Sequence, residues 1–204
     1  MAFQNVIMPK LKLVHGASKQ IVDPVTVIGN GARETRRKQN RYERFVWNFP
    51  TRSILNETKT ELYSFFRGVN MALDSFLFQD PDFPEFTYTP LINQKSGDSW
   101  YFETPTGHPI FNPDMANLVF RVGGVIKTAT FAIDANGRPV VTVADSALGG
   151  VTVTGPCYLA VRLGAPISWA ITAMDKSVTG QTCTPTPSIV DLSDITLVEV
   201  FEHA

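Results

Sequence analysis

The chain has 204 residues, of which 44% are hydrophobic and 18% charged, and its formal net charge is −1. This length allows one large β domain or two small ones with a real core. The near-neutral charge argues against a nucleic-acid binder driven by electrostatics, and no apolar run reaches membrane-spanning length. The first residues lack the features of a signal peptide, so we expect a chain that folds in the cytoplasm without a membrane anchor. A low charged fraction also suggests surface covered by partners, as in an oligomer.

The N-terminal part predicts short strands around a basic segment. Residues alternate in character at 10–15, again at 25–28, and in an aromatic strand containing Phe45, Trp47 and Phe49. Between the last two runs, six positive residues face only Glu34 and Glu43: Arg33, Arg36, Arg37, Lys38, Arg41 and Arg44. Such a run is either a solvated hairpin that keeps an edge soluble or an arm that grips an acidic surface. Because no nucleic-acid motif accompanies it, we expect an arm to bind protein rather than DNA.

The stretch 58–83 predicts a helix that continues directly into a strand. Thr58 and Glu61 have the spacing of a capping box. Apolar residues then recur on one helical face, at Leu62, Phe65, Phe66, Val69 and Leu73. Phe76 and Phe78 alternate with their neighbours as on a half-buried strand that ends at Asp80-Pro81. We expect the helix to lay its aromatic stripe on a sheet that includes this strand.

Two proline-rich segments, DPDFPEFTYTP and GQTCTPTPS, read as extended connectors that divide the chain. Between them, short runs with turn signals predict the strands of a β-sandwich, at 100–102, 117–122, 126–133, 139–143, 151–153, 158–161 and 167–173. Asn136-Gly137 is a strong hairpin signal. We therefore expect a mainly β fold in two domains. The first is a β-sandwich with one packed helix, at 1–83, to which 187–204 return as the last strand; the second is an inserted β-sandwich-like domain at 86–180.

The residues give no support for catalysis. The three histidines are scattered, and the nucleophile elbow, the P-loop and the H-E-x-x-H motif are all missing from the sequence. We expect His108, in a Gly-His-Pro turn, to lie at the surface. Cys157 and Cys183 lack the clustered partners of a metal site, so we expect two buried thiols and leave a disulfide open. The sequence predicts no catalytic residue, no metal and no cofactor.

The order of the N-terminal motifs carries a resemblance. RETRRKQNRYERFVWNF, ELYSFF and SFLFQDPDF follow one another as an arginine-rich segment, an aromatic strand, a helix and an F-x-F-x-D-P strand. This order resembles the distal tail proteins of the branch found in tailed phages, prophages and gene transfer agents. The likeness covers about residues 1–83 and, more weakly, the β-rich middle and the closing strand. The sequence of the middle domain does not match the family residue by residue.

The resemblance implies a structural protein of the virion tail, made in the bacterial host cytoplasm. Such proteins form a ring, typically a homohexamer, that joins the tail tube to the tail tip or baseplate hub. A belt domain builds the ring, a peripheral β-sandwich lies outside it, and DNA passes through without specific binding. For this chain, the resemblance implies contacts to a neighbouring subunit or the tube through Arg33, Arg36, Arg37, Arg41 and Arg44. It also implies a belt core of Phe45, Trp47, Leu62, Phe65, Phe66, Phe76 and Phe78.

Two other classes of function remain at this point. A carbohydrate-binding β-sandwich used in host attachment would employ exposed aromatic residues, and the candidates are Trp100, Tyr101 and Trp169. The competing interpretation of these residues is core packing, which is the more frequent role of aromatic residues in a sandwich. An enzyme acting on a cell-surface polymer is the third class, and nothing local in the sequence supports it.

Overall fold

The chain is described here by a computed structural model. It describes residues 3–9, 17–22, 25–30, 33–38, 43–50, 52–71, 73–111, 113–146, 149–179 and 182–201. At 25–30, 33–38, 52, 172–179 and 182–188 it describes the backbone alone. The described residues are mainly β and contain one helix, as the sequence predicts. They fall into two compact units, each described by itself below. Unit 1 is Met1–Phe76 with Val161–Val200, and unit 2 is Leu77–Ala160 with Phe201–Ala204.

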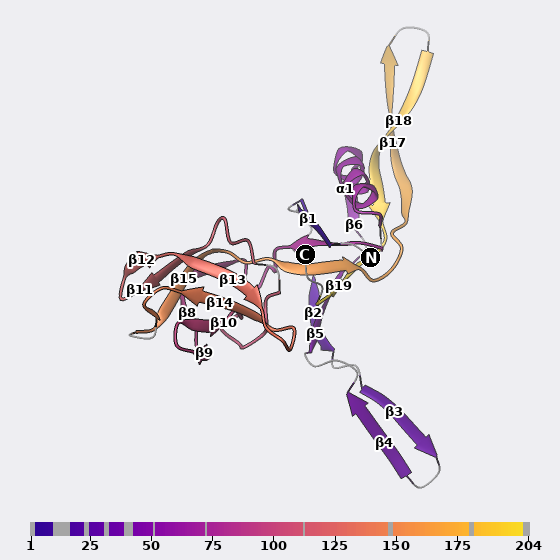
Figure 1. The fold of residues 1–204 in the computed structure, drawn as a ribbon. Coiled ribbons are helices and arrows are strands. Elements are labelled where there is room, and N and C mark those ends of the chain that lie inside the picture. Colours follow the sequence, from indigo (N-terminus) through magenta and orange to yellow (C-terminus); the bar gives the residue numbers. More distant parts are fainter. Residues whose placement is uncertain are drawn as a thin grey trace. The chain divides into compact units, whose positions relative to one another are not determined.

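Unit 1 is built from three sheets and a helix (Figure 1). Its elements are β1 (Phe3–Ile7), β2 (Ser18–Val22), β3 (Val25–Asn30), β4 (Arg33–Lys38), β5 (Arg44–Phe49), β6 (Arg52–Leu55), α1 (Asn56–Gly68), β7 (Ser75–Phe78), β16 (Leu159–Leu163), β17 (Trp169–Thr179), β18 (Thr182–Leu192) and β19 (Ile195–Glu199). The largest sheet has the order β1-β7-β16-β19-β5-β2, a second has the order β17-β18-β6, and β3 pairs with β4. The chain leaves unit 1 within β7 and returns within β16.

Helix α1 packs its aromatic side chains on β7, as the sequence predicts. The ring centroid of Phe76 lies 5.2 Å from that of Phe65 and 5.8 Å from that of Phe66, both in edge-to-face geometry. Leu62 and Phe66 are buried on the same helix face. One part of the helix prediction is wrong: Leu73 lies beyond the helix and is 66% exposed.

The expected start of the helix is also wrong. The helix begins at Asn56, two residues before the predicted cap, so Thr58 and Glu61 lie inside its first turns. Leu55 occupies the N-cap position with extended backbone angles and makes no side-chain capping bond. The side chain of Lys59 donates to Asn56 Oδ1 at 3.3 Å, and Thr60 Oγ1 donates to the Asn56 carbonyl oxygen at 2.8 Å. The helix therefore starts where strand β6 ends, without the cap that the sequence suggested.

Strand β7 is more deeply buried than an alternating pattern predicts. All four of its residues, Ser75–Phe78, are buried, so side chains on both faces of the strand are covered. This position follows from the sheet order, because β7 pairs between β1 and β16 rather than at an edge. The expectation of a half-buried strand was wrong for this reason.

Unit 2 is a β-sandwich of two four-stranded sheets (Figure 1). Its strands are β8 (Glu85–Pro90), β9 (Gln94–Ser96), β10 (Ser99–Tyr101), β11 (Val119–Val122), β12 (Val125–Lys127), β13 (Ala129–Ile133), β14 (Pro139–Val143) and β15 (Val151–Pro156). One sheet has the order β13-β14-β10-β9 and the other has the order β12-β11-β15-β8. Phe102, which follows β10, contacts the rings of Phe86 and Phe120 from the opposite sheet, at 5.6 and 6.3 Å between centroids. These rings lie in the core of the sandwich.

The run 126–133, expected as a single strand, is two strands in different sheets. Strand β12 pairs with β11, whereas β13 pairs with β14. The chain thus crosses from one sheet to the other at Thr128, a change that an apolar alternation cannot reveal. The Asn136-Gly137 hairpin is confirmed: β13 and β14 are antiparallel, and Gly137 takes a positive φ of 73°.

The boundaries between the units differ from those expected. Residues 167–173 were assigned to the second domain, but β17 pairs with β18, and β18 pairs with β6 of unit 1. The return to unit 1 consequently begins at Val161 rather than at 187. Unit 2 begins at Leu77, which is earlier than the proline-rich segment that was taken as the boundary.

Much of each proline-rich segment is a strand rather than a connector. EFTYTP forms β8, which pairs with β15, and TCTPTPSIVDL forms β18. Pro185 and Pro187 pair with β17 on one side, whereas β6 reaches only residues 189–192 on the other. Over 182–188, β18 is therefore an edge among the described strands, and an edge tolerates residues without an N–H donor.

A β-bulge interrupts the pairing of β8 with β15. The register shifts between Val153 and Gly155, and the backbone of Gly155 has a φ of 138°. A Cβ atom at Gly155 would lie 2.4 Å from the carbonyl oxygen of Asn117. The bulge therefore requires glycine both for its dihedral angle and for its close approach to the backbone.

We expect Gly155→Ala to lower the free energy of unfolding by about 2 kcal/mol or more, because the new methyl group meets backbone at a strained φ. Urea unfolding followed by circular dichroism measures the change. Gly150→Ala is the matched control, since nothing lies within 4 Å of a Cβ atom there. Equal unfolding midpoints for the two variants would contradict this account of the bulge.

Candidate interaction surface

An apolar pocket lies between helix α1 and the sheet β17-β18-β6 of unit 1. It has a volume of about 80 Å³ and is lined by Lys59, Leu62, Tyr63, Phe66, Met71, Ile167, Trp169, Leu192 and Ile195. Ligand sites for drug-sized molecules have volumes of about 300–1,000 Å³. A pocket of this size and lining fits an apolar side chain better than a small-molecule substrate.

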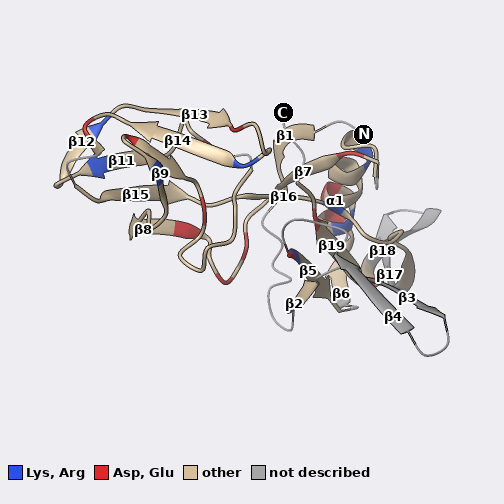
Figure 2. Ribbon diagram, turned by 60° about the horizontal axis from the view of Figure 1, so that its bottom comes forward, with Lys and Arg blue, Asp and Glu red and all other residues tan. Residues whose placement is uncertain are grey.

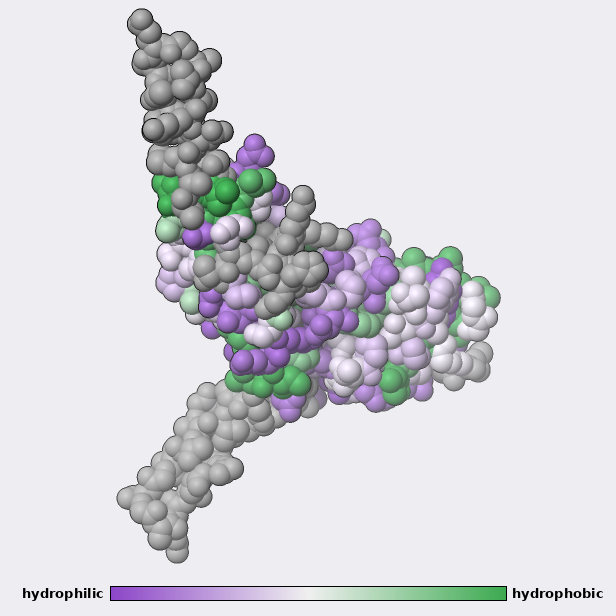
Figure 3. All heavy atoms as spheres, turned by 180° about the vertical axis from the view of Figure 1, so that it is seen from behind, coloured by the Kyte–Doolittle hydropathy of each residue, from purple (hydrophilic) through white to green (hydrophobic). Residues whose placement is uncertain are grey.

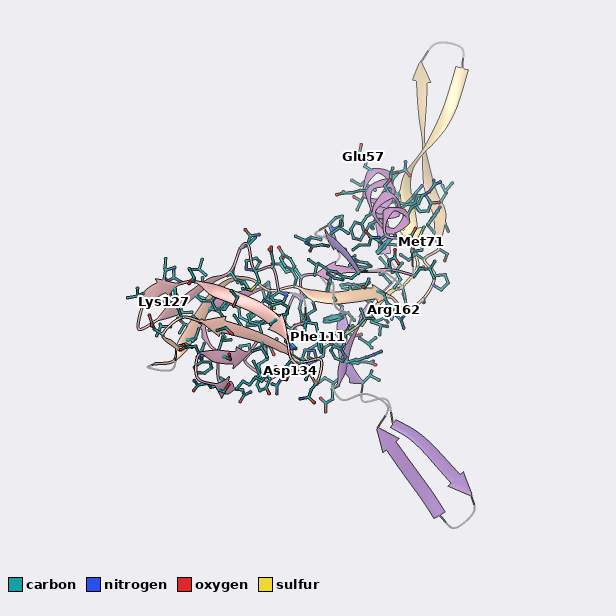
Figure 4. The ribbon with its side chains drawn as sticks, viewed as in Figure 1. Glu57, Met71, Phe111, Lys127, Asp134 and Arg162 are labelled. Atoms are coloured by element: carbon teal, nitrogen blue, oxygen red, sulfur yellow. The ribbon has the colours of Figure 1, made fainter. Side chains whose placement is uncertain are left out.

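Aromatic and cationic groups form the mouth of the pocket. The ring of Trp169, 41% exposed, meets the ring of Tyr63 edge to face at 5.1 Å. Lys59 Nζ lies 5.4 Å from the centre of the Trp169 ring, within the range of a cation–π contact. Met71 follows the C-terminal end of α1 and is 36% exposed (Figure 4). Tryptophan, tyrosine and methionine are enriched in protein interfaces.

Further exposed apolar residues lie on both faces of the sheet that borders the pocket. We use the name apolar surface of unit 1 for a set of residues that are 36–66% exposed: Leu55, Met71, Leu73, Trp169, Ile171 and Ile189. In the sheet, Leu55 pairs directly with Ile189, so both side chains lie on one face. Trp169 pairs with Leu192, which lines the pocket, and therefore lies on the face covered by α1. Figure 3 shows hydrophobic residues gathered in a green patch in its upper left part.

The predicted core residues are covered to different degrees. Trp47, Leu62, Phe66 and Phe76 are buried in unit 1, while Phe45 and Phe65 are half-buried. Phe78 is buried as well, but it belongs to unit 2. Lys19 covers the outer side of the aromatic strand, with its Nζ 4.1 Å from the centre of the Phe45 ring. The aromatic residues of this region therefore pack within the subunit.

The basic segment is described only in part. Arg33, Arg36 and Arg37 lie on β4, of which the backbone alone is described, and Arg41 lies outside the described residues. Arg44 begins β5, where it is half-buried and pairs with Val22 of the edge strand β2. Of the acidic residues near the C-terminus, Asp191 accepts a hydrogen bond from Ser53 at 2.5 Å, and Glu199 accepts one from the Phe45 amide at 2.9 Å. These two acceptor contacts hold strands of unit 1 together.

Trp100 and Tyr101, which the sequence predicts as glycan contacts, are both at least partly covered by other residues of the chain. Trp100 is only 6% exposed, and its Nε1 donates to Ser146 Oγ at 2.8 Å, so it is a core residue that cannot stack on a sugar. One face of Tyr101 is covered by Arg138, whose Cζ lies 3.5 Å from the ring centre. Arg138 is held there by an ion pair with the buried Glu103, at 2.6 Å between Nη2 and Oε2.

The histidine and cysteine predictions have mixed outcomes. His108 is 8% exposed, so the expectation of a surface turn histidine is wrong; its ring lies 6.1 Å from that of Phe201. Cys157 is a buried thiol, as expected, whereas the side chain of Cys183 lies outside the described part of the chain. Among the described residues, no group of three or more His, Cys, Asp or Glu side chains could hold a metal ion.

The comparisons with known proteins identify no family for this chain. No protein-family model matches the chain, and no curated protein matches it. Within the described residues, no helix is long and apolar enough to cross a membrane. Of the residues of the apolar surface, the sequence interpretation named only Trp169 and Leu73, and it placed Leu73 on the apolar face of the helix. Leu55, Met71 and Ile189 each carry an ordinary apolar side chain whose exposure depends on the tertiary structure.

One carboxylate of unit 2 has a shifted pKa. Asp134 Oδ1 accepts hydrogen bonds from the Arg138 amide at 2.8 Å and from the Asn136 amide at 2.9 Å. The Nζ atom of Lys95 lies 3.4 Å from Asp134 Oδ2. The hydrogen bond from Arg138, with those from Asn136 and Lys95, holds the pKa of Asp134 below its ordinary value of 3.8, against the raising effect of burial. Figure 4 shows Asp134 at the opposite end of unit 2 from Lys127.

Because the folded pKa is lowered, Asp134 stabilises the folded state fully above pH 3.8, and this contribution is lost as the pH falls through the folded pKa. Asp134→Asn keeps the acceptor oxygen but loses the charge. We expect the difference in unfolding free energy between wild type and this variant to be constant above about pH 5 and to shrink at lower pH. Urea unfolding at several pH values tests this, with Asp134→Ala as the variant that also loses the acceptor. A difference independent of pH down to about pH 2 would refute the lowered pKa.

Proposed function

We propose that this protein is a distal tail protein of a phage-like particle and that unit 1 forms the ring joining the tail tube to the tail tip or baseplate hub. Its partners would be further copies of itself, in a homohexamer, together with the tube and hub proteins. DNA would pass through the ring without specific binding. In this proposal the protein is structural, is not an enzyme, and resides in the virion tail.

The observation that carries the proposal is the apolar surface of unit 1. In an isolated subunit, Leu55, Leu73 and Ile171 would each leave more than half of their surface in water, at 60%, 66% and 57% exposure. Large apolar residues exposed on both faces of one sheet, beside an aromatic-lined pocket on one of them, favour protein association. A ring subunit needs such a surface to bind its neighbours.

The two β-hairpins of unit 1 provide separate support. Strands β17 and β18 pair over eleven residues each, but β6 joins them only at residues 189–192. Strands β3 and β4 pair with each other and, among the described strands, with nothing else. A two-stranded ribbon by itself is at best marginally stable in water, so both hairpins suit docking on a partner. The positive residues of β4, Arg33, Arg36, Arg37 and Lys38, favour an acidic protein surface for that hairpin.

The mass of the purified protein in solution tests the proposal, by light scattering over a concentration series with and without a tail-tube protein. We expect a closed oligomer near six subunits, formed alone at high concentration or when the tube protein is added. Electron microscopy of the assembled species should then show a ring with a central channel. A strict monomer under all these conditions would refute the proposed function.

Leu55→Asp should separate assembly from folding. Leu55 is 60% exposed on the apolar surface and also occupies the N-cap of α1 without a capping bond. Aspartate is among the best N-cap residues, so the subunit should gain about 0.5–2 kcal/mol of stability. The same change places a charge in the proposed interface, and we expect the dissociation constant of the oligomer to rise at least about tenfold.

The matched control is Ile92→Asp, because Ile92 is equally exposed, at 63%, but lies in unit 2. It should leave the oligomer intact. If Leu55→Asp assembles as well as the wild type, the apolar surface is not the ring contact.

A further inference from the structure

The turn between β13 and β14 places a glycine directly after an exposed asparagine. Asn136 is exposed, and Gly137 takes a positive φ of 73°. In an Asn-Gly pair the glycine has no side chain to hinder its own amide nitrogen, so this nitrogen can reach the side-chain carbonyl carbon of the asparagine. The pair that directs the hairpin is therefore chemically labile as well as turn-forming.

Cyclisation at Asn136 converts its side-chain amide to an acid. The Gly137 nitrogen forms a bond to Asn136 Cγ, the Cγ–Nδ2 bond breaks, and ammonia leaves with the proton that the Gly137 nitrogen gives up. Water then opens the cyclic imide: hydrolysis at Cγ yields aspartate, and hydrolysis at the main-chain carbonyl yields isoaspartate. The net reaction consumes one water and releases one ammonia, and it needs neither an oxidant nor an enzyme.

Hydrogen bonds to Asp134 hold the reacting nitrogen away from this attack. The Gly137 amide donates to the carbonyl oxygen of Asp134 at 2.8 Å. Asp134 Oδ1 accepts the amide of Asn136 at 2.9 Å and the amide of Arg138 at 2.8 Å. Each of the three amides that follow Ala135 therefore donates to Asp134. Cyclisation requires the turn to open, and the population of the open turn depends on these hydrogen bonds.

Residues outside the turn hold both of its ends. The side chain of Asp134 is 5% exposed, and its Oδ2 lies 3.4 Å from Nζ of Lys95 on β9. Arg138 forms an ion pair with Glu103, at 2.6 Å between Nη2 and Oε2. Figure 2 shows a red segment that follows β13 and a blue segment that precedes β14, which are the acidic and basic ends of this turn. The carboxylate that caps the turn is therefore fixed from outside it.

We propose that Asn136 is a deamidation site and that Asp134 is the positioning residue that sets its rate. While the carboxylate of Asp134 caps the turn, the Gly137 nitrogen stays bonded and the amide of Asn136 persists. Each opening of the turn exposes the pair to cyclisation, so conversion is slow in the folded protein and fast in the unfolded chain. The inference is independent of ring formation, because every residue involved lies in unit 2.

The conversion weakens the hairpin in which it occurs. Either product places a new carboxylate two residues from Asp134, and like charges at this spacing repel each other. Isoaspartate also lengthens the backbone by one methylene group. Ile133 pairs with Pro139 directly beside the turn, and the next residues of β14, Val140 and Val141, are 6% and 0% exposed. A lengthened turn therefore disturbs the strand register next to the core of unit 2.

Ageing of the full-length protein in mildly alkaline buffer tests this inference. Peptide mapping by mass spectrometry measures conversion at Asn136 and separates it from the other Asn-Gly pair of the sequence, at 30–31. An isoaspartyl methyltransferase detects the isoaspartate product. We expect conversion in the folded wild type to be about tenfold or more slower than in the chain unfolded in guanidinium chloride. Asp134→Ala should convert about tenfold or more faster than the folded wild type, and Asp134→Asn, which keeps an acceptor oxygen, should lie between them.

Two variants separate protection by Asp134 from general stability. Gly155→Ala is expected to destabilise unit 2 at a bulge in the other sheet and to leave the turn intact, so its conversion at Asn136 should stay slower than that of Asp134→Ala. Asn136→Gln has a longer side chain that cyclises far more slowly. It should keep its melting temperature on ageing, whereas the melting temperature of the aged wild type should fall as Asn136 is converted.

The inference is overturned if Asn136 converts as fast in the folded wild type as in the unfolded chain, or if it converts in neither. It also fails if Asp134→Ala converts no faster than the wild type, or if Gly155→Ala converts as fast as Asp134→Ala. An aged wild type that keeps its melting temperature after conversion would refute the effect on the hairpin.

Discussion

The packing of helix α1 on strand β7 is the contact on which the rest of unit 1 depends. Phe76 is fully buried and touches the rings of Phe65 and Phe66, so the helix and the six-stranded sheet share one aromatic cluster. Phe76 is also the last residue of the first segment of unit 1, immediately before the chain enters unit 2. A single cluster thus positions the helix, and with it the pocket beside Trp169, on the strand that leads out of the unit.

The two units present surfaces of different chemistry. Unit 1 exposes aliphatic and aromatic residues around a small pocket, which favours another protein as the partner. In unit 2 the buried Glu103 pairs with Arg138, and Tyr88, with a positive φ, lies beside Arg121 on an outer sheet face.

The edge of the sheet β17-β18-β6 combines two opposite tendencies. The free part of β18 contains Pro185 and Pro187, and prolines in an edge strand discourage unplanned pairing with other strands. Exposed apolar residues such as Leu55 and Ile189 have the opposite effect, because they favour association. The backbone of this edge therefore discourages strand pairing, whereas the exposed apolar side chains of the same sheet favour association.

The sequence by itself determined the mainly β class, the aromatic helix and the hairpin at Asn136-Gly137, because these depend on periodicity and on turn residues that act locally. Tertiary structure decided the rest. It placed residues 85–90 and 182–188 of the proline-rich segments in edge strands, which need few N–H donors, and it divided the run 126–133 between two sheets. It also buried Trp100 and exposed Tyr88, two aromatic residues that sequence alone cannot separate. Exposure depends on which distant strands cover a side chain, and the bulge that turns Tyr88 outward requires Gly155 on a partner strand that is remote in the sequence.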